Sequence, residues 1–493
     1  MNDRVTIRRL TTGVPGLDAI LGGGLPEFSF NLISGAPGSG KTTLAHQLMF
    51  ALATPEHPAL FFTVLGEPPL KMFRYQQQFS FFDLGKINQS IRFVNLSDDV
   101  ASGRLERVLA RIRDEVAASS PAFVFVDSLR SVRLETPSPM AGTISLQQFI
   151  QELGMLLSSW QATTFLIGEY LLESDPHPVF TVADGLLALG QSVHRNSMVR
   201  QIQVLKMRGQ ATSPGMHTFR ITDAGVEVFP AAVVRDDTAA APATRLRHSE
   251  ARLGMGVPRL DEMLGGGLPE GYSLLVAGPS GSGKTILATS FLTEGIRVGE
   301  PGVLVAFEQT PSQSRNRTVD GLVRTGKLGL INTRSLDLSI DEIVQQLVKL
   351  VHDNHAKRVV IDSLSGFELA VAPTFREDFR ESLFRMVAAL AGLGVTVLMT
   401  SELEDRYTDL RFSPYGSAFL TDAIIVQRYI EVDSCLKRVM SVVKVRASKH
   451  STEIRQYEID DDGIAIGKTL LGYSGLLCGQ PMRSEVAGGR GAP

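Results

Sequence analysis

Short apolar runs alternate with longer segments of helical character in each half of the chain. In the first half these runs are FNLISG, ALFFTVL, IRFVNL and AFVFVDS. The segment LERVLARIRDEVAA, between the last two runs, and the residues that follow Lys41 have the pattern of helices. Strands that are apolar on both faces and alternate with helices are typical of a parallel sheet covered on both sides. The pattern therefore predicts an α/β fold with a mostly parallel sheet, whose ligands bind beyond the carboxyl ends of the strands.

The chain contains the same unit twice. TGVPGLDAILGGGLP at residues 12–26 returns as MGVPRLDEMLGGGLP at residues 255–269, with 11 of 15 positions identical. The same offset of 243 residues relates GAPGSGKTTLA to GPSGSGKTILA. A repeat of this length indicates a duplicated structural unit rather than two stray motifs.

The length of 493 residues agrees with this duplication, because one hydrophobic core rarely serves a chain so long. Composition marks the boundaries: VVRDDTAAAPATRLRHSEAR is rich in Ala and charge and reads as a linker, and CGQPMRSEVAGGRGAP reads as a tail. We expect domains at residues 1–234 and 251–471, a linker at 235–250 and a flexible tail at 472–493.

Composition narrows the classes of function. A formal net charge of −3 gives no basic field, which makes nucleic-acid binding unlikely. No run of about 18 apolar residues suggests a membrane span, and the start MNDRVTIRRL lacks the apolar core of a signal peptide. Cys435 and Cys478 are the only cysteines, which suits a reducing compartment. We expect a cytoplasmic protein that does not bind membranes.

The motif G-x-x-x-x-G-K-[ST] occurs twice, each time between an apolar run and a helical segment. Its glycines let successive backbone N–H groups face phosphate oxygens, and the helix N-terminus adds partial positive charge. The lysine would reach the terminal phosphates, and the last residue would bind Mg²⁺. These motifs predict two ATP sites, made by Gly35, Gly38, Ser39, Gly40, Lys41, Thr42 and Thr43, and by Gly278, Gly281, Ser282, Gly283, Lys284, Thr285 and Ile286.

A carboxylate at the tip of a neighbouring strand should complete each magnesium site. AFVFVDS ends in Asp127 and RVVIDS contains Asp362, and each would join the hydroxyl of Thr42 or Thr285. A lone aspartate after an apolar strand is more often a turn residue or a helix cap. The upstream phosphate loops reverse that preference, so we expect Mg²⁺ at both sites.

Hydrolysis also needs a carboxylate that orients water. VLVAFEQTP in the second unit offers Glu308 at a strand tip. The aligned segment FFTVLGEPP has Gly66 at that position and Glu67 one residue later. Glu308 is therefore the candidate base of the second site, whereas Glu67 is either a base that reaches from one position further along or a solvated loop carboxylate.

A third repeated feature is K-x-R on a late strand, which gives Lys206 and Arg208 in QVLKMRGQ and Lys444 and Arg446 in VVKVRASK. Residues two apart share one face of a strand. Exposed strand cations are usually only solvated, but their repetition favours a role on the γ-phosphate. If a neighbouring subunit supplied these cations, the active sites would lie between subunits.

These motifs together resemble the KaiC family of RecA-like ATPases. The resemblance rests on the doubled G-V-P-x-L-D-x-x-L-G-G-G-L-P segment, the FEQTP strand tip, IDSL, and the KMRG and KVRASKH strands, and it covers nearly the whole chain. It implies two tandem RecA-like P-loop domains, a homohexameric ring with ATP between protomers, Glu308 as base, and the K-x-R cations acting in trans. A signalling partner that reads the nucleotide state belongs to the leading hypothesis below, although the family's partner-binding tail is not recognisable in this sequence.

The chain departs from the family at the phosphorylation switch. Where the clock protein of this family has adjacent Ser and Thr before a T-D pair, this sequence has Ala418 and Phe419 before Thr421 and Asp422. The usual acceptor pair is thus absent. Ser417 and Thr421 flank the position, so serine/threonine autokinase activity at a shifted acceptor stays open.

Three functions follow from the sequence. The first is a Mg²⁺-dependent ATPase with a signalling or clock-like role. The second is a RecA-like DNA recombinase or helicase, which should carry basic DNA-facing loops, and none is evident. The third is a nucleotide-gated scaffold with negligible turnover, which Gly66 favours for the first site.

Overall fold

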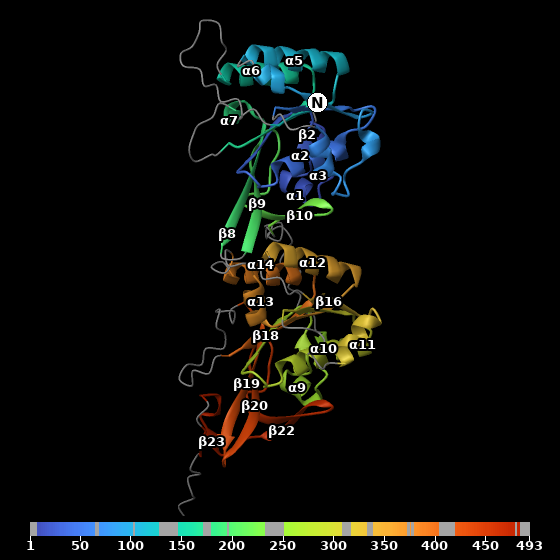
Figure 1. Ribbon diagram of the computed structural model, residues 1–493. Coiled ribbons are helices and arrows are strands. Elements are labelled where there is room, and N and C mark those ends of the chain that lie inside the picture. Colours follow the sequence, from blue (N-terminus) through green and yellow to red (C-terminus); the bar gives the residue numbers. More distant parts are fainter. Residues whose placement is uncertain are drawn as a thin grey trace, which may run out of the picture. The chain divides into compact units, whose positions relative to one another are not determined.

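The computed structural model describes residues 7–64, 69–101, 104–127, 146–170, 179–194, 197–231, 251–307, 317–332, 339–371, 375, 379–403, 420–478 and 481–483. The chain divides into two compact units, Met1–Ala231 and Ala232–Pro493 (Figure 1). Each unit is an α/β domain with a nine-stranded sheet, which confirms the fold class predicted from the apolar runs.

The first unit begins with a small two-stranded antiparallel sheet, whose strands are separated in the chain by a helix, and then alternates strands and helices. Its helices are α1 (Leu17–Leu21), α2 (Lys41–Leu52), α3 (Pro69–Gln76), α4 (Ser97–Ala101), α5 (Leu105–Ser119), α6 (Leu146–Ser159) and α7 (Val179–Val182). Its strands are β1 (Arg9–Leu10), β2 (Leu25–Pro26), β3 (Phe30–Gly35), β4 (Ala59–Thr63), β5 (Ile91–Asn95), β6 (Phe123–Asp127), β7 (Thr163–Gly168), β8 (Gly185–His194), β9 (Ser197–Met207), β10 (His217–Thr222) and β11 (Gly225–Phe229).

The second unit repeats this plan. Its helices are α9 (Pro258–Met263), α10 (Lys284–Arg297), α11 (Arg317–Arg324), α12 (Ile340–Asp353), α13 (Leu364–Ala370) and α14 (Phe379–Gly392). Its strands are β12 (Arg252–Leu253), β13 (Leu268–Pro269), β14 (Ser273–Gly278), β15 (Gly302–Ala306), β16 (Leu328–Asn332), β17 (Arg358–Asp362), β18 (Thr396–Glu402), β19 (Ala423–Val432), β20 (Cys435–Val445), β21 (Arg455–Asp460), β22 (Gly463–Thr469), β23 (Tyr473–Ser474) and β24 (Met482–Arg483).

Both large sheets have the same topology. The strand order is β11-β10-β9-β8-β3-β7-β6-β4-β5 in the first unit and β16-β15-β17-β18-β14-β19-β20-β21-β22 in the second. From β8 to β5, and from β16 to β19, neighbouring strands are parallel. The remaining strands add an antiparallel extension at one edge. The strand before each phosphate loop, β3 or β14, is therefore in the middle of its sheet.

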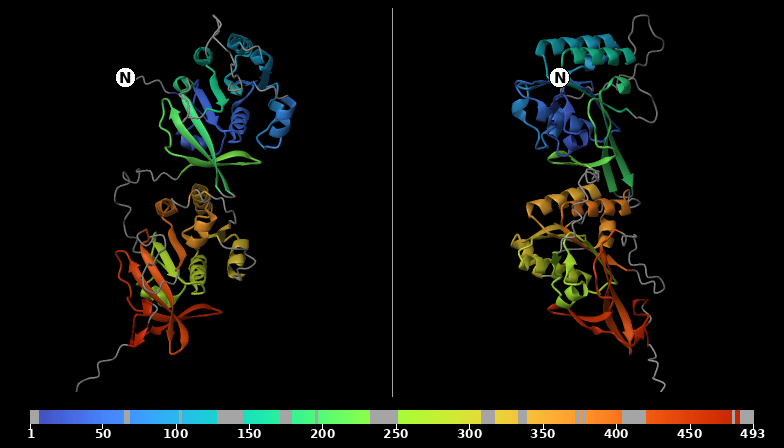
Figure 2. Two further views of the ribbon diagram at one scale, coloured as in Figure 1. Left: turned by 60° about the vertical axis from the view of Figure 1, so that its left-hand side comes forward. Right: turned by 180° about the vertical axis from the view of Figure 1, so that it is seen from behind.

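Helices cover both faces of each sheet (Figure 2). In the first unit α1 and α2 bury apolar side chains against one face, and α5 and α6 against the other. In the second unit α9 and α10 cover one face, and α12, α13 and α14 cover the other. Burial on both faces explains why the central strands read as unbroken apolar runs. None of the described helices combines the length and apolar character that crossing a bilayer requires.

The segment that composition assigned to a flexible tail contains structure near its start. Strands β23 and β24 pair, and a short 3₁₀ helix lies between them at Leu476–Cys478. Leu476 is buried against Ile430, Val432 and Val439 of the β19–β20 hairpin. A few apolar side chains among glycines and polar residues are a weak signal, so composition alone did not reveal this contact. The expected linker, residues 235–250, lies outside the described residues.

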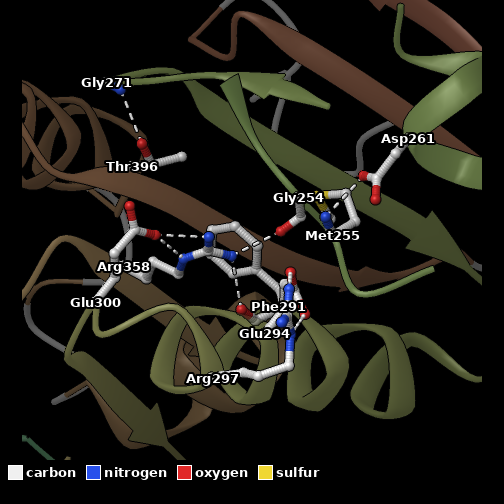
Figure 3. Close-up of polar contacts among 10 residues, drawn as sticks. All are labelled: Gly254, Met255, Asp261, Gly271, Phe291, Glu294, Arg297, Glu300, Arg358 and Thr396. Atoms are coloured by element: carbon white, nitrogen blue, oxygen red, sulfur yellow. Dashed lines mark hydrogen bonds and ion pairs between the residues drawn. The ribbon is translucent and has the colours of Figure 1, made fainter. Parts of the chain in front are cut away.

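A buried arginine distinguishes the second unit from the first (Figure 3). Arg358, 1% exposed, pairs with Glu300 through Nη2–Oε2 and Nε–Oε2 distances of 2.7 and 2.9 Å. Its Nη1 donates to the carbonyls of Gly254 and Phe291, and its guanidinium lies 4.6 Å from the Phe291 ring centroid. In the first unit Phe123 opens the corresponding strand. The second unit thus ties the start of β17 to α10 through a charge network.

Candidate functional site

Each phosphate loop links the middle strand of its sheet to a helix. In the first unit β3 ends at Gly35 and α2 begins at Lys41; in the second, β14 ends at Gly278 and α10 begins at Lys284. The loops therefore lie at the carboxyl ends of the parallel strands, which is where the α/β pattern predicted that a ligand would bind. The N-termini of both helices face this edge and contribute partial positive charge.

Glycine is required at two positions of each loop. Gly38 and Gly281 have φ of +76° and +75°, and Gly40 and Gly283 both have +97°. In addition, a Cβ on Gly40 would lie 2.8 Å from Cδ1 of Ile221. These left-handed conformations turn consecutive N–H groups toward one side of the loop, which is the arrangement that binds phosphate oxygens.

The loop lysines bond to their own loops. Lys41 Nζ donates to the carbonyl of Ala36 at 2.8 Å, and Lys284 Nζ donates to the carbonyls of Gly278 and Pro279, both at 2.8 Å. Burial lowers the pKa of Lys41, and the Glu169 and Asp127 carboxylates oppose that effect. Both ammonium groups thus lie within the loop curve, where the terminal phosphates would contact them.

The serines of the two loops have different surroundings. Ser39 is fully buried, and its Oγ has no hydrogen-bond partner within the described parts of the chain. Ser282 Oγ donates to Gln427 Oε1 at 3.0 Å, and its carbonyl accepts from the Tyr457 hydroxyl. Thr43 and Ile286 occupy the third positions of α2 and α10. The second loop is thus held by side chains of β19 and β21 in addition to its own backbone.

The aspartates predicted to bind magnesium end β6 and β17, on the same edge as the loops. Thr42 Oγ1 donates to Asp127 Oδ2 at 2.9 Å, so the two predicted oxygen ligands of the first site are together. In the second site Asp362 Oδ1 accepts from Thr400 Oγ1 at 2.5 Å. A hydroxyl and a carboxylate beside a phosphate loop are the ligands that Mg²⁺ prefers, and the first site in particular fits this ion.

Two carboxylates at this edge were not foreseen. Glu402 ends β18 and is in register with Gly278, and Glu169 directly follows β7, whose last residue pairs with Ser34. Glu169 also acts electrostatically on Lys41. The signal was present in the sequence, because TFLIGE and VLMTSE end in glutamate at corresponding places in the repeat. Recognising it required knowing that these strands flank the phosphate loops.

The K-x-R cations lie near the amino ends of the central parallel strands, opposite the carboxyl ends that carry the phosphate loops. Lys206 Nζ donates to the carbonyl of Phe180 at 3.3 Å, and Lys444 Nζ donates to that of Thr421 at 2.6 Å. Arg208 and Arg446 are more than half exposed. Burial lowers the pKa of each lysine, and the neighbouring arginine lowers it further.

Strand register shows how far these cations are from the phosphate loop of their own unit. Arg208 N donates to the carbonyl of Asp184, whose own N–H donates to the carbonyl of Phe30, the first residue of β3. Gly35 is five residues further along that strand. At about 3.3 Å per residue, Arg208 is thus about 17 Å below the loop along the strand direction. An arginine side chain does not span that distance.

Several predicted residues lie outside the described residues: Glu67, Glu308, Ser417, Ala418 and Phe419. Thr421, the other candidate phosphoacceptor, is described. It precedes β19 and is fully buried, with its carbonyl bonded to Lys444. A buried hydroxyl at this place is not accessible to a nucleotide.

Comparison with known proteins agrees with this geometry. The sequence profile of the KaiC ATPase matches residues 10–233 and 253–470. The circadian clock oscillator protein KaiC of Picosynechococcus sp. (strain ATCC 27264 / PCC 7002 / PR-6) is 27% identical over 97% of this chain and 93% of its own length. That of Rippkaea orientalis (strain PCC 8801 / RF-1) is 28% identical over 97% and 92%. KaiC 1 of Synechocystis sp. (strain ATCC 27184 / PCC 6803 / Kazusa) is 27% identical over 98% and 93%. This chain therefore belongs to the KaiC family of ATPases.

Proposed function

We propose that this protein hydrolyses Mg²⁺-bound ATP at both phosphate loops and that each site is completed by the K-x-R cations of a neighbouring copy in a homohexameric ring. The observation that carries this proposal is the separation of Arg208 from the phosphate loop of its own unit, about 17 Å along the strand. Arg446 has the same place in the second unit, at the foot of β14.

Solvent-exposed cations at that edge can reach a phosphate only if another molecule presents it. A head-to-tail contact, in which the K-x-R edge of one copy meets the loop edge of the next, uses two different surfaces of the molecule. Heterologous contacts of this kind form a ring when the rotation from one copy to the next closes after a whole number of copies. Because the K-x-R cations and the phosphate loop are present in both units, the first units and the second units would each form a ring layer through the same kind of contact.

Within each site the residues would have separate tasks. The loop N–H groups and Lys41 or Lys284 bind the phosphates, and Thr42 with Asp127, or Thr285 with Asp362, holds the ion. Magnesium, when bound, neutralises charge on the outer phosphate oxygens. Glu308, and Glu67 in the first site, orients the attacking water. Arg208 or Arg446 of the neighbour stabilises charge that develops on the γ-phosphate.

The biological role that we propose is signalling through nucleotide state, read by a cytoplasmic protein partner. The clock proteins similar to this chain support a timing role. The net charge of −3 does not support the DNA recombinase alternative. Of the two hydroxyls that flank the usual acceptor position, Thr421 is buried, which leaves Ser417 as the candidate for autophosphorylation.

The test is incubation of the full-length protein with γ-labelled ATP and Mg²⁺, in which released phosphate and protein-bound label are followed together. We expect phosphate release that depends on Mg²⁺ and falls by at least about 100-fold in Glu308→Gln with Lys41→Ala, which leaves neither site competent. Label that maps to Ser417 would add autokinase activity. Intact ATP binding without phosphate release would identify a nucleotide-gated scaffold and contradict the proposal.

A further inference from the structure

Asp184 connects the K-x-R cations of the first unit to the foot of the strand that leads to the phosphate loop. Its Oδ1 accepts from Arg208 Nη1 at 3.0 Å, and its Oδ2 accepts from the backbone N–H of Phe30 at 3.0 Å. The backbone of Asp184 is held as well, because its N–H donates to the carbonyl of Phe30 at 2.7 Å and its carbonyl accepts from Arg208 N at 2.9 Å. The position of the carboxylate is thus fixed by its own backbone and by Phe30, independently of its bond to the guanidinium.

Asp422 makes the same contacts in the second unit. Its Oδ1 accepts from Arg446 Nη1 at 3.3 Å, and its Oδ2 accepts from Ser273 N at 3.0 Å and from Ser273 Oγ at 2.9 Å. The Asp422 N–H donates to the carbonyl of Ser273 at 2.9 Å, and the Asp422 carbonyl accepts from Arg446 N at 2.8 Å. In both units the aspartate lies 24 residues before its arginine. The arrangement persists although Ser273 replaces Phe30.

These ion pairs are poorly suited to stabilising the fold. The arginine side chains are 61% and 54% exposed, and the aspartates are 29% and 27% exposed. Exposed pairs of this kind contribute little to stability because water and salt screen them. What the pair does provide is orientation: a long, flexible side chain is held at one Nη by a carboxylate that is itself fixed to the sheet. A guanidinium has five N–H donors, so one such bond leaves donors for a phosphate.

We infer that Asp184 and Asp422 are positioning residues, which hold Arg208 and Arg446 in the direction from which a neighbouring copy presents its nucleotide. This inference rests on the proposed function, in which the two arginines act on a neighbour's ATP. Each aspartate is also bonded to the first residue of the strand that ends at a phosphate loop. It therefore connects the arginine, which contacts the nucleotide of one neighbouring copy, with the phosphate loop that receives the arginine of the other neighbouring copy.

The test uses Asp422→Asn in a full-length Lys41→Ala background, where only the second site turns over. Asparagine keeps an oxygen for Ser273 N, while its amide group cannot accept a bond from Arg446. We expect kcat for ATP to fall roughly tenfold, as for a misplaced catalytic contact, with KM changed by less than about twofold. In an Arg446→Ala background the same substitution should have no further effect on kcat.

Asp433→Asn is the matched control. It breaks the exposed Asp433–Arg483 pair, 2.7 Å long in the same unit, and should leave kcat unchanged. The reciprocal pair, Asp184→Asn in a Lys284→Ala background, tests the first site and replaces Asp422→Asn if that variant does not fold.

The outcomes separate the inference from the proposed function. A loss of turnover in Arg446→Ala without one in Asp422→Asn would overturn the positioning role and leave the proposed function standing. The same holds if the loss of kcat in the double variant is the product of the losses in the two single variants. An Arg446→Ala protein as active as its parent would remove the role of the arginine and the inference with it. A tenfold loss that disappears when Arg446 is absent supports the positioning role.

Discussion

Replacing Glu300 by Gln should destabilise the second unit and leave the first unchanged. Arg358 is almost completely buried, and the Glu300 carboxylate is its ion-pair partner. Both hydrogen bonds from Arg358 go to Oε2 of Glu300, so a glutamine oxygen in that place retains them while the substitution removes the charge. The buried guanidinium then has no countercharge, although the carbonyls of Gly254 and Phe291 still accept its hydrogen bonds.

The magnitude follows from the contacts. Removing one partner of a buried pair costs about 3–5 kcal/mol, but Glu300 is 18% exposed and the hydrogen bonds to its one oxygen survive, so we expect about 2–3 kcal/mol. For a domain of about 220 residues this corresponds to a fall in Tm of about 5–10 °C. The matched control is Arg297→Gln, which breaks the exposed Arg297–Glu294 pair and should change neither transition.

The sequence offers a convenient assay for this difference. Trp160 is the only tryptophan, and it lies in the first unit between α6 and β7. Tryptophan fluorescence therefore follows unfolding of the first unit, whereas far-UV circular dichroism follows both. In Glu300→Gln the dichroism should show a component at lower temperature, with an unchanged fluorescence midpoint. Identical dichroism curves for the variant and its parent would refute the reasoning that Glu300 compensates a buried charge.

Three further predictions concern other contacts. Burial lowers the pKa of His46 to about 4, so below pH 6.5 the unfolded chain takes up a proton that the folded chain does not. The free energy of unfolding of the first unit should therefore fall by up to about 3 kcal/mol between pH 6.5 and 4. His46→Gln should flatten this pH dependence, measured by denaturant titration with Trp160 fluorescence. Thr400→Val removes the donor to Asp362 and should raise the Mg²⁺ concentration for half-maximal turnover about tenfold, measured in a Lys41→Ala background, while Thr400→Ser should restore it. Gly22→Ala would place a Cβ 2.0 Å from the carbonyl of Ala211 at φ +81° and should lower the fluorescence midpoint by several degrees, a loss of about 1–3 kcal/mol.

The sequence was sufficient for the fold and for the phosphate loops because both depend on local patterns. Apolar runs between helical segments predict the parallel sheet, and G-x-x-x-x-G-K-[ST] between a strand and a helix places Lys41 and Lys284. The place of Asp127 beside Thr42 was also predicted, since it is at the tip of a strand next to the loop, and its role in binding Mg²⁺ stays a prediction.

The residues that were missed depend on tertiary register. Glu402 is beside Gly278 only because β18 pairs with β14, and Asp422 meets Arg446 only because β19 and β20 form a hairpin. Arg358 begins an apolar run, where a charged residue is usually a solvated strand end. Its burial follows from Glu300 and two carbonyls that come together only in the folded unit.

The central claim is that a site on one copy is completed by cations of another, and subunit mixing tests it most directly. One variant, Arg208→Ala with Arg446→Ala, keeps its loops but lacks the arginines; the other, Lys41→Ala with Lys284→Ala, keeps the arginines but lacks the loop lysines. Each alone should hydrolyse ATP slowly, and the mixture, after exchange of subunits, should recover a substantial part of the turnover of the wild-type protein. A mixture no faster than the average of its two components would contradict the account.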